Sequence, residues 1–155
     1  MKKFKKNINS FLCFALYTAI LLVVAILLKE FAIDTYFDNQ GYTNQFFDIT
    51  YILNEGAAFG LLPQQSAVLC GVAAFVICMI SCYMFNNPKK ITNFERFTLA
   101  MISAGIISNT LERLKLGAVI DYIDLNFVNF PVFNVADIFI CLGICLFLIA
   151  IFFKR

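Results

Sequence analysis

Histidine and tryptophan are both absent from this sequence of 155 residues. Without an imidazole group, the chain has no Ser–His–Asp triad, no Cys–His dyad and no His-ligated zinc or haem. Charge is scarce as well, because Asp, Glu, Lys and Arg make up only 14% of the chain, against about 25% in an ordinary soluble domain. These shortages exclude histidine-dependent enzymes and disfavour a water-soluble globule.

Apolar residues make up 61% of the chain, against about 45–50% in soluble domains, and the mean hydropathy is +0.83. Four stretches approach the ~20 apolar residues that a membrane-spanning helix needs. They lie at about residues 11–28, 66–85, 94–111 and 136–153. We therefore expect a single membrane-embedded domain, residues 1–155, with four transmembrane helices.

The first stretch follows four lysines and has the layout of a cleaved signal peptide. Its apolar run is too long for one and ends in no small-x-small cleavage site, so we interpret it as a permanent span. Nine of the twelve basic residues lie before the first stretch, between the second and third, or after the fourth, and nine of the ten acids lie on the other side or at its membrane edge. By the positive-inside rule, both termini are cytoplasmic and residues 29–65 and 112–135 face outward.

The outward segment between the first two spans is too long to be only a connector. Within it, Phe46–Leu53 is rich in aromatic and β-branched residues and contains neither Gly nor Pro, which favours a strand. The predicted fold class is therefore an all-α membrane protein with a small β element in the extracytoplasmic loop between helices one and two.

Six cysteines lie inside apolar runs. Cys78 and Cys82, like Cys141 and Cys145, have a helical spacing that could in principle hold a metal. With no histidine and no acidic pair close by, the simpler interpretation is that all six are small buried hydrophobes, as free cysteine usually is. We expect no metal and no cofactor.

Polar residues cluster at the outer ends of the apolar stretches, where ionisable groups tend to be functional. The segment Asn54–Gly60 contains several small residues, so it fits a tight turn into the second span or a close approach of the backbone to a ligand or helix. Near the end of the third stretch, Asn109 fits an interhelical hydrogen bond as well as a site. Arg113 equally fits a side chain that snorkels to the membrane surface.

Two aspartates complete the pattern. Asp121 interrupts the apolar stretch Ala118–Ile123. Asp137 follows Asn134 by three residues, which fits a helix N-cap with an acid in the first turn as well as a catalytic acid. Both aspartates belong to the same predicted membrane edge, and two carboxylates that share a site cannot both ionise easily, so one keeps a proton.

A carboxylate beside a carboxylic acid can activate water and protonate a leaving amine without histidine or metal. The pair Asp121 and Asp137 therefore predicts peptide hydrolysis by the aspartic-protease scheme. Asn54 and Asn109 are then candidates to hold the substrate backbone or to stabilise the tetrahedral oxyanion.

Four motifs resemble those of one family, the lipoprotein signal peptidases (signal peptidase II), which are four-span aspartic proteases of bacterial inner membranes. Asn54-Glu55-Gly56-Ala57-Ala58-Phe59 resembles the family's Asn-x-Gly-Ala-Ala-Phe, and Asn109-Thr110-Leu111-Glu112-Arg113 resembles its Gly-Asn-x-x-Asp-Arg. The stretches with the two catalytic aspartates are matched by Val119-Ile120-Asp121-Tyr122-Ile123 and Phe133-Asn134-Val135-Ala136-Asp137. The sequence departs from the family pattern at Ala25-Ile26, where Asp-Gln is usual, and at Ser108 and Glu112, where Gly and Asp are usual.

The resemblance implies cleavage of prolipoproteins before a diacylglyceryl-modified cysteine, at the extracytoplasmic face of the bacterial cytoplasmic (inner) membrane. It implies that Asp121 and Asp137 are catalytic and that a supporting, substrate-binding set consists of Asn54, Gly56, Asn109, Arg113 and Asn134. The expected partners are prolipoproteins and membrane lipids, with no nucleic acid, and the expected state is a monomer. Aromatic residues suit the membrane interface, so those of the outer loop are expected to close over the substrate: Phe46, Phe47, Tyr51 and Phe59.

Three other functions remain open at this point. A catalytically weak or inactive relative that binds lipoproteins or lipids would keep Asn54 and the aromatic loop but would have little need of both aspartates. A small transporter or channel subunit would want charged or small residues in mid-span rather than at one edge. A Ser–Lys peptidase would depend on Lys29, and no Ser is clearly paired with it.

The predicted orientation can be tested by chemical labelling. After the native cysteines are replaced, a cysteine introduced at Asn39 should react with an impermeant thiol reagent in intact cells, because residue 39 is expected outside. Reaction only after the cells are opened would reverse the predicted orientation.

Overall fold

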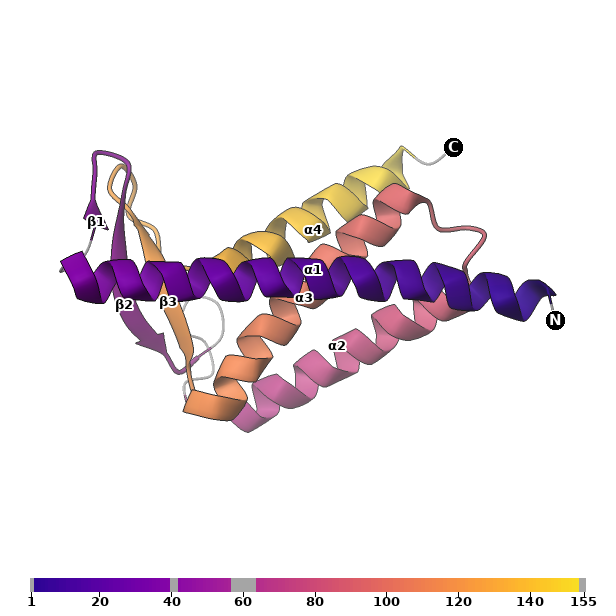
Figure 1. The fold of residues 1–155 in the computed structure, drawn as a ribbon, viewed down its shortest axis with the longest axis horizontal. Coiled ribbons are helices and arrows are strands. Elements are labelled where there is room, and N and C mark those ends of the chain that lie inside the picture. The colour runs from indigo at the N-terminus through magenta and orange to yellow at the C-terminus, as the bar shows by residue number, and fades with distance from the viewer. Residues whose placement is uncertain (1, 40–41, 57–63, 154–155) are drawn as a thin grey trace.

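The structure is a computed structural model that describes residues 2–39, 42–56 and 64–153. These residues form a helical bundle with a small sheet at one end (Figure 1). The elements, in chain order, are α1 (Lys2–Asn39), β1 (Tyr42–Thr43), β2 (Phe47–Asn54), α2 (Ser66–Asn86), α3 (Asn93–Leu116), β3 (Val119–Leu125) and α4 (Val135–Phe152). The expected class, a helical membrane protein with a small β element, is confirmed.

Helices α1, α2 and α4 are long and apolar enough to cross a membrane, whereas α3 does not meet the same criterion within the described residues. The reason is its place in the fold. Helix α3 packs against all three other helices, and its middle is buried, including the polar residues Thr98, Ser103 and Asn109. A helix that is surrounded by protein can carry polar groups, because neighbouring helices rather than lipid surround them.

Helix α1 is longer than expected. Its apolar stretch ends at Leu28, and residues 29–65 were predicted as a loop, but the helix continues to Asn39. No Gly or Pro interrupts residues 29–39, and this extension packs onto the sheet. Ala32 is buried with Ile120 and Tyr122 of β3, so the end of α1 lies across the strands (Figure 1).

The sheet is antiparallel with the order β1-β2-β3. Strand β2 matches the strand predicted at Phe46–Leu53 to within one residue at each end. Strand β3 was missed, although its sequence is also rich in β-branched and aromatic residues. The pairing of Asn54 with Val119 and of Ile52 with Asp121 brings the Asn54 motif beside the first aspartate.

A glycine sets the change of direction between α3 and β3. Gly117 has φ of +75° and donates its N–H to the Arg113 carbonyl, the left-handed helix ending for which glycine is favoured. Its own carbonyl accepts a hydrogen bond from the Ser66 hydroxyl at the start of α2. The chain therefore leaves α3 at the same end of the bundle where α2 begins.

The expectation that all six cysteines are buried is wrong. Cys70 is half-buried, and the others are exposed on the protein surface rather than buried: Cys13, Cys78, Cys82, Cys141 and Cys145. In a membrane protein, lipid is as apolar as a protein core, so an apolar run around a cysteine does not predict burial inside the protein.

Helices α3 and α4 approach closely at glycines. A Cβ atom on Gly105 would lie 2.3 Å from the Ala136 carbonyl oxygen and 2.7 Å from the Ile140 side chain. Gly143 of α4 faces α3 in the same way, against the Thr98 carbonyl oxygen and Ile102. The contact at Gly105 places the C-terminal half of α3 against the start of α4.

Replacement of Gly105 by Ala should therefore destabilise the protein by about 1–3 kcal/mol, the usual cost of overpacking a tight interface. The matched control is Gly71→Ala on α2, where a Cβ atom would meet nothing within 4 Å. Thermal unfolding in detergent measures both variants. Equal melting temperatures for the two variants would contradict the close α3–α4 contact.

Candidate active site

Asp121 lies on β3, at the end of the bundle where the sheet lies, and is only 3% exposed. Its two carboxylate oxygens accept hydrogen bonds from different elements. The Asn54 side-chain amide on β2 donates to Oδ2 at 2.9 Å, and the Asn134 side-chain amide donates to Oδ1 at 2.7 Å. Two neutral donors therefore hold this buried carboxyl in place.

Asp137 lies in the first turn of α4. The expected N-cap is present, because Asn134 Oδ1 accepts from the Asp137 N–H at 3.0 Å and Asp137 Oδ2 accepts from the Asn134 N–H at 3.1 Å. In addition, the Asn109 side-chain amide donates to Asp137 Oδ1 at 2.8 Å. Asp137 thus joins α3 to α4 as well as capping its own helix.

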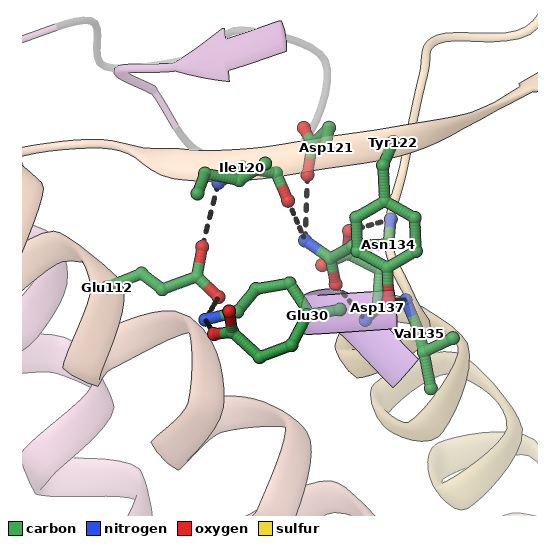
Figure 2. Close-up of polar contacts among 9 residues, drawn as sticks. Glu30, Glu112, Ile120, Asp121, Tyr122, Asn134, Val135 and Asp137 are labelled. Carbon is green, nitrogen blue, oxygen red and sulfur yellow. Dashed lines mark hydrogen bonds and ion pairs between the residues drawn. The ribbon is translucent and has the colours of Figure 1, made fainter. Parts of the chain in front are cut away.

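Asn134 connects the two aspartates. Its amide nitrogen donates to Asp121, and its backbone N–H and amide oxygen form the reciprocal cap with Asp137, so one residue fixes both carboxyl groups (Figure 2). Figure 2 shows the three residues meeting where β3 passes over the start of α4. The predicted pair therefore forms a single cluster.

The pKa of Asp121 is raised to about 6. Burial is the main cause, and the negative charges of Asp137 and Glu112 raise it further, while the hydrogen bonds from Asn54 and Asn134 act in the opposite direction. A carboxyl group with this pKa gains and loses its proton close to neutral pH. This property is what a coupled acid–base pair requires.

The two aspartates line one end of a groove of about 1240 Å³. The polar end is also formed by Asn54, Gly56, Asn109 and Arg113, so all predicted site residues except Asn134 line it. The remainder is largely apolar and is lined mainly by side chains of α2, α4 and the segment before α4: Leu69, Val72, Val76, Ile138, Ile140, Phe130 and Val132. The groove therefore combines a polar end with an apolar body.

Arg113 ties α3 to the end of β2. Its guanidinium donates to the Gly56 carbonyl at 2.8 Å, and the Gly56 N–H donates to Asn54 Oδ1 at 3.0 Å. Asn54 is thereby oriented with its amide nitrogen toward Asp121. Residues Ala57, Ala58 and Phe59 of the same motif lie outside the described residues.

The aromatic residues expected over the substrate occupy a different place. Phe46, Phe47 and Tyr51 do not line the groove, and the Tyr51 ring instead stacks on Tyr36 of α1 with centroids 6.0 Å apart. Because α1 continues past the expected end of its span, it covers this face of the sheet. Phe59, the fourth residue of that set, lies outside the described residues.

Two charged residues near the site were not predicted as part of it. Glu112 is 5% exposed and accepts from the Ile120 N–H at 2.8 Å, and the Lys29 ammonium lies 3.1 Å from its other oxygen. In the sequence, Glu112 lies between the predicted site residues Asn109 and Arg113. This position could have indicated that Glu112 belongs to the site. Lys29 is far from Glu112 in the sequence, and the packing of α1 against α3 brings the two side chains together.

No group of three or more His, Cys, Asp and Glu side chains is arranged to hold a metal ion within residues 2–39, 42–56 and 64–153. The polar groups in the groove are carboxylates, side-chain amides and a guanidinium. Groups of these kinds can carry out acid–base chemistry and can bind a peptide backbone.

The helical bundle, the sheet and the groove define a multi-pass membrane enzyme. The fold is similar to that of a solved bacterial membrane enzyme determined by the in meso method at 2.3 Å resolution, with a TM-score of 0.77, 21% identity, and coverage of 90% of this chain and 87% of that one. A second structure of a bacterial membrane enzyme, at 1.9 Å resolution, gives a TM-score of 0.72 at 21% identity and covers 92% and 94% of the two chains.

The sequence comparisons identify the family. The profile described as "Signal peptidase (SPase) II" matches residues 10–153. A lipoprotein signal peptidase of Moorella thermoacetica is 37% identical over 80% of this chain and 83% of its own length. One from Streptococcus agalactiae is 35% identical over 66% of each chain. This chain belongs to the signal peptidase II family of aspartic peptidases.

The raised pKa of Asp121 predicts how stability depends on pH. Its ordinary value is 3.8 and its folded value is about 6, so between these values the folded protein binds more protons than the unfolded chain. The free energy of unfolding should therefore fall as pH rises through this window. We expect the melting temperature of the wild type to fall more between pH 4 and 7 than that of Asp121→Asn. Parallel melting curves for the two proteins would contradict the raised pKa.

Proposed function

We propose that this protein removes signal peptides from prolipoproteins by cleaving the peptide bond before a diacylglyceryl-modified cysteine, with Asp121 and Asp137 as the catalytic pair. The observation that carries the proposal is that Asn134 holds both carboxyl groups at the polar end of an otherwise apolar groove. The names of the relatives support the same substrate class.

The chemistry requires one proton shared between the two carboxyl groups. The ionised carboxylate takes a proton from a water molecule, and the water oxygen attacks the carbonyl carbon of the scissile bond. The protonated carboxyl group donates its proton to the carbonyl oxygen. When the tetrahedral intermediate collapses, the C–N bond breaks and the leaving nitrogen receives a proton.

Amide and guanidinium groups around the pair support this reaction. Asn54 and Asn109 each donate to one aspartate and keep it in position. Asn109 and Arg113 line the groove, and among the described residues each has one buried side-chain atom without a hydrogen-bond partner, the side-chain oxygen of Asn109 and Nε of Arg113. An acceptor and a donor of this kind fit the N–H and C=O groups of a bound peptide.

The shape of the groove fits a lipid-modified peptide. A diacylglyceryl cysteine has acyl chains in the bilayer and a peptide at its surface. The apolar wall of α2 and α4 suits the acyl chains, since both helices are apolar enough to lie in the membrane. The polar end with Asn54, Gly56 and Arg113 suits the peptide.

We place the enzyme in the bacterial cytoplasmic membrane as a monomer, with the site at the extracytoplasmic face. The segregation of basic residues supports this orientation. In addition, the beginning of α1 and the end of α4 lie at the end of the bundle away from the sheet (Figure 1). A relative that only binds lipids would gain nothing from two buried carboxyl groups, because burying charge is costly.

Replacement of Asp121 or Asp137 by Asn should lower the cleavage rate by at least about 10²-fold, since general acid–base catalysis contributes about 10²–10⁴-fold. Asn cannot take a proton from water, but it caps a helix about as well as Asp. The assay follows cleavage of a diacylglyceryl-modified prolipoprotein peptide by the purified protein. The control Asp124→Asn changes a half-buried aspartate on the same strand.

The control should retain wild-type rates. A fully active Asp137→Asn enzyme would reduce Asp137 to a helix cap, and a fully active Asp121→Asn enzyme would remove the proposed mechanism. Melting temperatures of all three variants show whether a loss of activity comes from loss of the fold.

A further inference from the structure

The Glu112 side chain lies between α1, α3 and β3, and both of its oxygens are used. One oxygen accepts from the Ile120 N–H at 2.8 Å, and the other lies 3.1 Å from the Lys29 ammonium. The glutamate is 5% exposed, and the Lys29 side chain is 16% exposed. Figure 2 shows Glu112 reaching from α3 to the backbone of β3.

The hydrogen bond from the Ile120 N–H to Glu112 lies directly beside Asp121 on β3. Ile120 directly precedes Asp121, and its carbonyl accepts the Asn134 amide at 3.5 Å. The β3 backbone at Asp121 is therefore held by α3 through Glu112 and by α4 through Asn134. The Asn54 amide on β2 holds the Asp121 carboxylate itself.

The positive charge of Lys29 offsets the free-energy cost of burying the Glu112 carboxylate. A buried carboxylate is costly unless an opposite charge and hydrogen bonds compensate it. The ammonium also lies 3.7 Å from Glu30, but the Glu30 side chain is 59% exposed, so that contact is weakened by solvent. The α1 extension thus supplies the countercharge for a group that contacts the catalytic strand.

We propose that Glu112 and Lys29 are positioning residues of this enzyme, whose ion pair holds the Ile120 N–H and thereby sets the place of Asp121 in the carboxylate pair. The proposal rests on the proposed catalytic role of Asp121. Neither residue touches the scissile bond. Their effect is on the geometry and the electrostatic environment of the carboxyl group that does.

The charged and titratable groups around Glu112 come from its own helix and from α1 and β3. They are Lys29 and Glu30 on α1, Arg113 and Lys115 on α3, and Asp121 and Tyr122 on β3. Asp137 on α4 acts on Asp121 and Tyr122. Removal of the Glu112 charge leaves Lys29 paired only with the exposed Glu30 and should lower the pKa of Asp121. Removal of the Lys29 charge leaves Glu112 unpaired and should raise it. Opposite shifts distinguish positioning by charge from a merely structural role.

The test compares Glu112→Gln, Lys29→Met and the double variant with the wild type. Gln keeps an acceptor for the Ile120 N–H, so KM for the diacylglyceryl peptide should stay within about twofold while kcat falls by about tenfold. The pH–rate profile should move to lower pH in Glu112→Gln and to higher pH in Lys29→Met. The double variant leaves no buried charge unpaired, since Glu30 is exposed, so its loss of kcat should be smaller than the product of the two single losses.

The matched control is Glu30→Gln, which removes the other carboxylate beside Lys29. Among the described hydrogen bonds, Glu30 makes none with β3. This variant should retain kcat and the pH profile. Unchanged kcat and pH profiles in both Glu112→Gln and Lys29→Met, or shifts in the same direction, would overturn the proposal. Where a single variant does not fold, Glu112→Asp, which keeps the charge, and the double variant provide the comparison.

A measurement without turnover separates this proposal from the proposed function. The carboxyl ¹³C resonance of Asp121, assigned by its loss in Asp121→Asn, reports the titration of this group directly. We expect its midpoint to move down in Glu112→Gln and up in Lys29→Met. Absence of cleavage by the wild-type protein would count against the proposed function alone, whereas an unmoved ¹³C titration would count against the positioning role.

Discussion

The structure of the site depends on the burial of two carboxyl groups side by side. Burial penalises their charge, so each needs hydrogen-bond donors, yet a cationic donor would favour the ionised form and lower the pKa. Neutral amides meet both demands. Asn54, Asn109 and Asn134 donate to Asp121 and Asp137, and Asn134 contacts both. The pKa of Asp121 is consequently raised rather than lowered, despite two hydrogen bonds to it.

The scaffold delivers the three donors and the aspartate Asp121 from four different places in the chain. Asn54 lies on β2, Asn109 on α3, and Asn134 just before α4, while Asp121 comes from β3. Helix α3 can carry polar groups because the other helices surround it, and the apolar faces of α2 and α4 are turned outward and toward the groove. A chain without histidine can therefore bring two carboxyl groups together at the end of an apolar bundle.

Much of this arrangement could be predicted from local patterns. The apolar stretches predicted all four helices, and the aromatic and β-branched run predicted β2, because hydrophobic length and strand composition act over neighbouring residues. The capping box at Asn134 and Asp137 was visible from a spacing of three residues. The catalytic roles of Asp121 and Asp137 remain predictions, but their meeting at one place follows from the two motifs lying at one membrane edge.

The sequence by itself determined the membrane class, the helices and the set of polar residues from which the site is built, since each depends on composition or short spacing. Tertiary structure decided which residues that are far apart in the sequence lie together. Strand β3 exists through its pairing with β2, the end of α1 is helical against the sheet, and Lys29 meets Glu112 because α1 packs against α3. It also decided that most of the cysteines face outward, because an apolar residue in a membrane protein is equally stable against lipid and against protein.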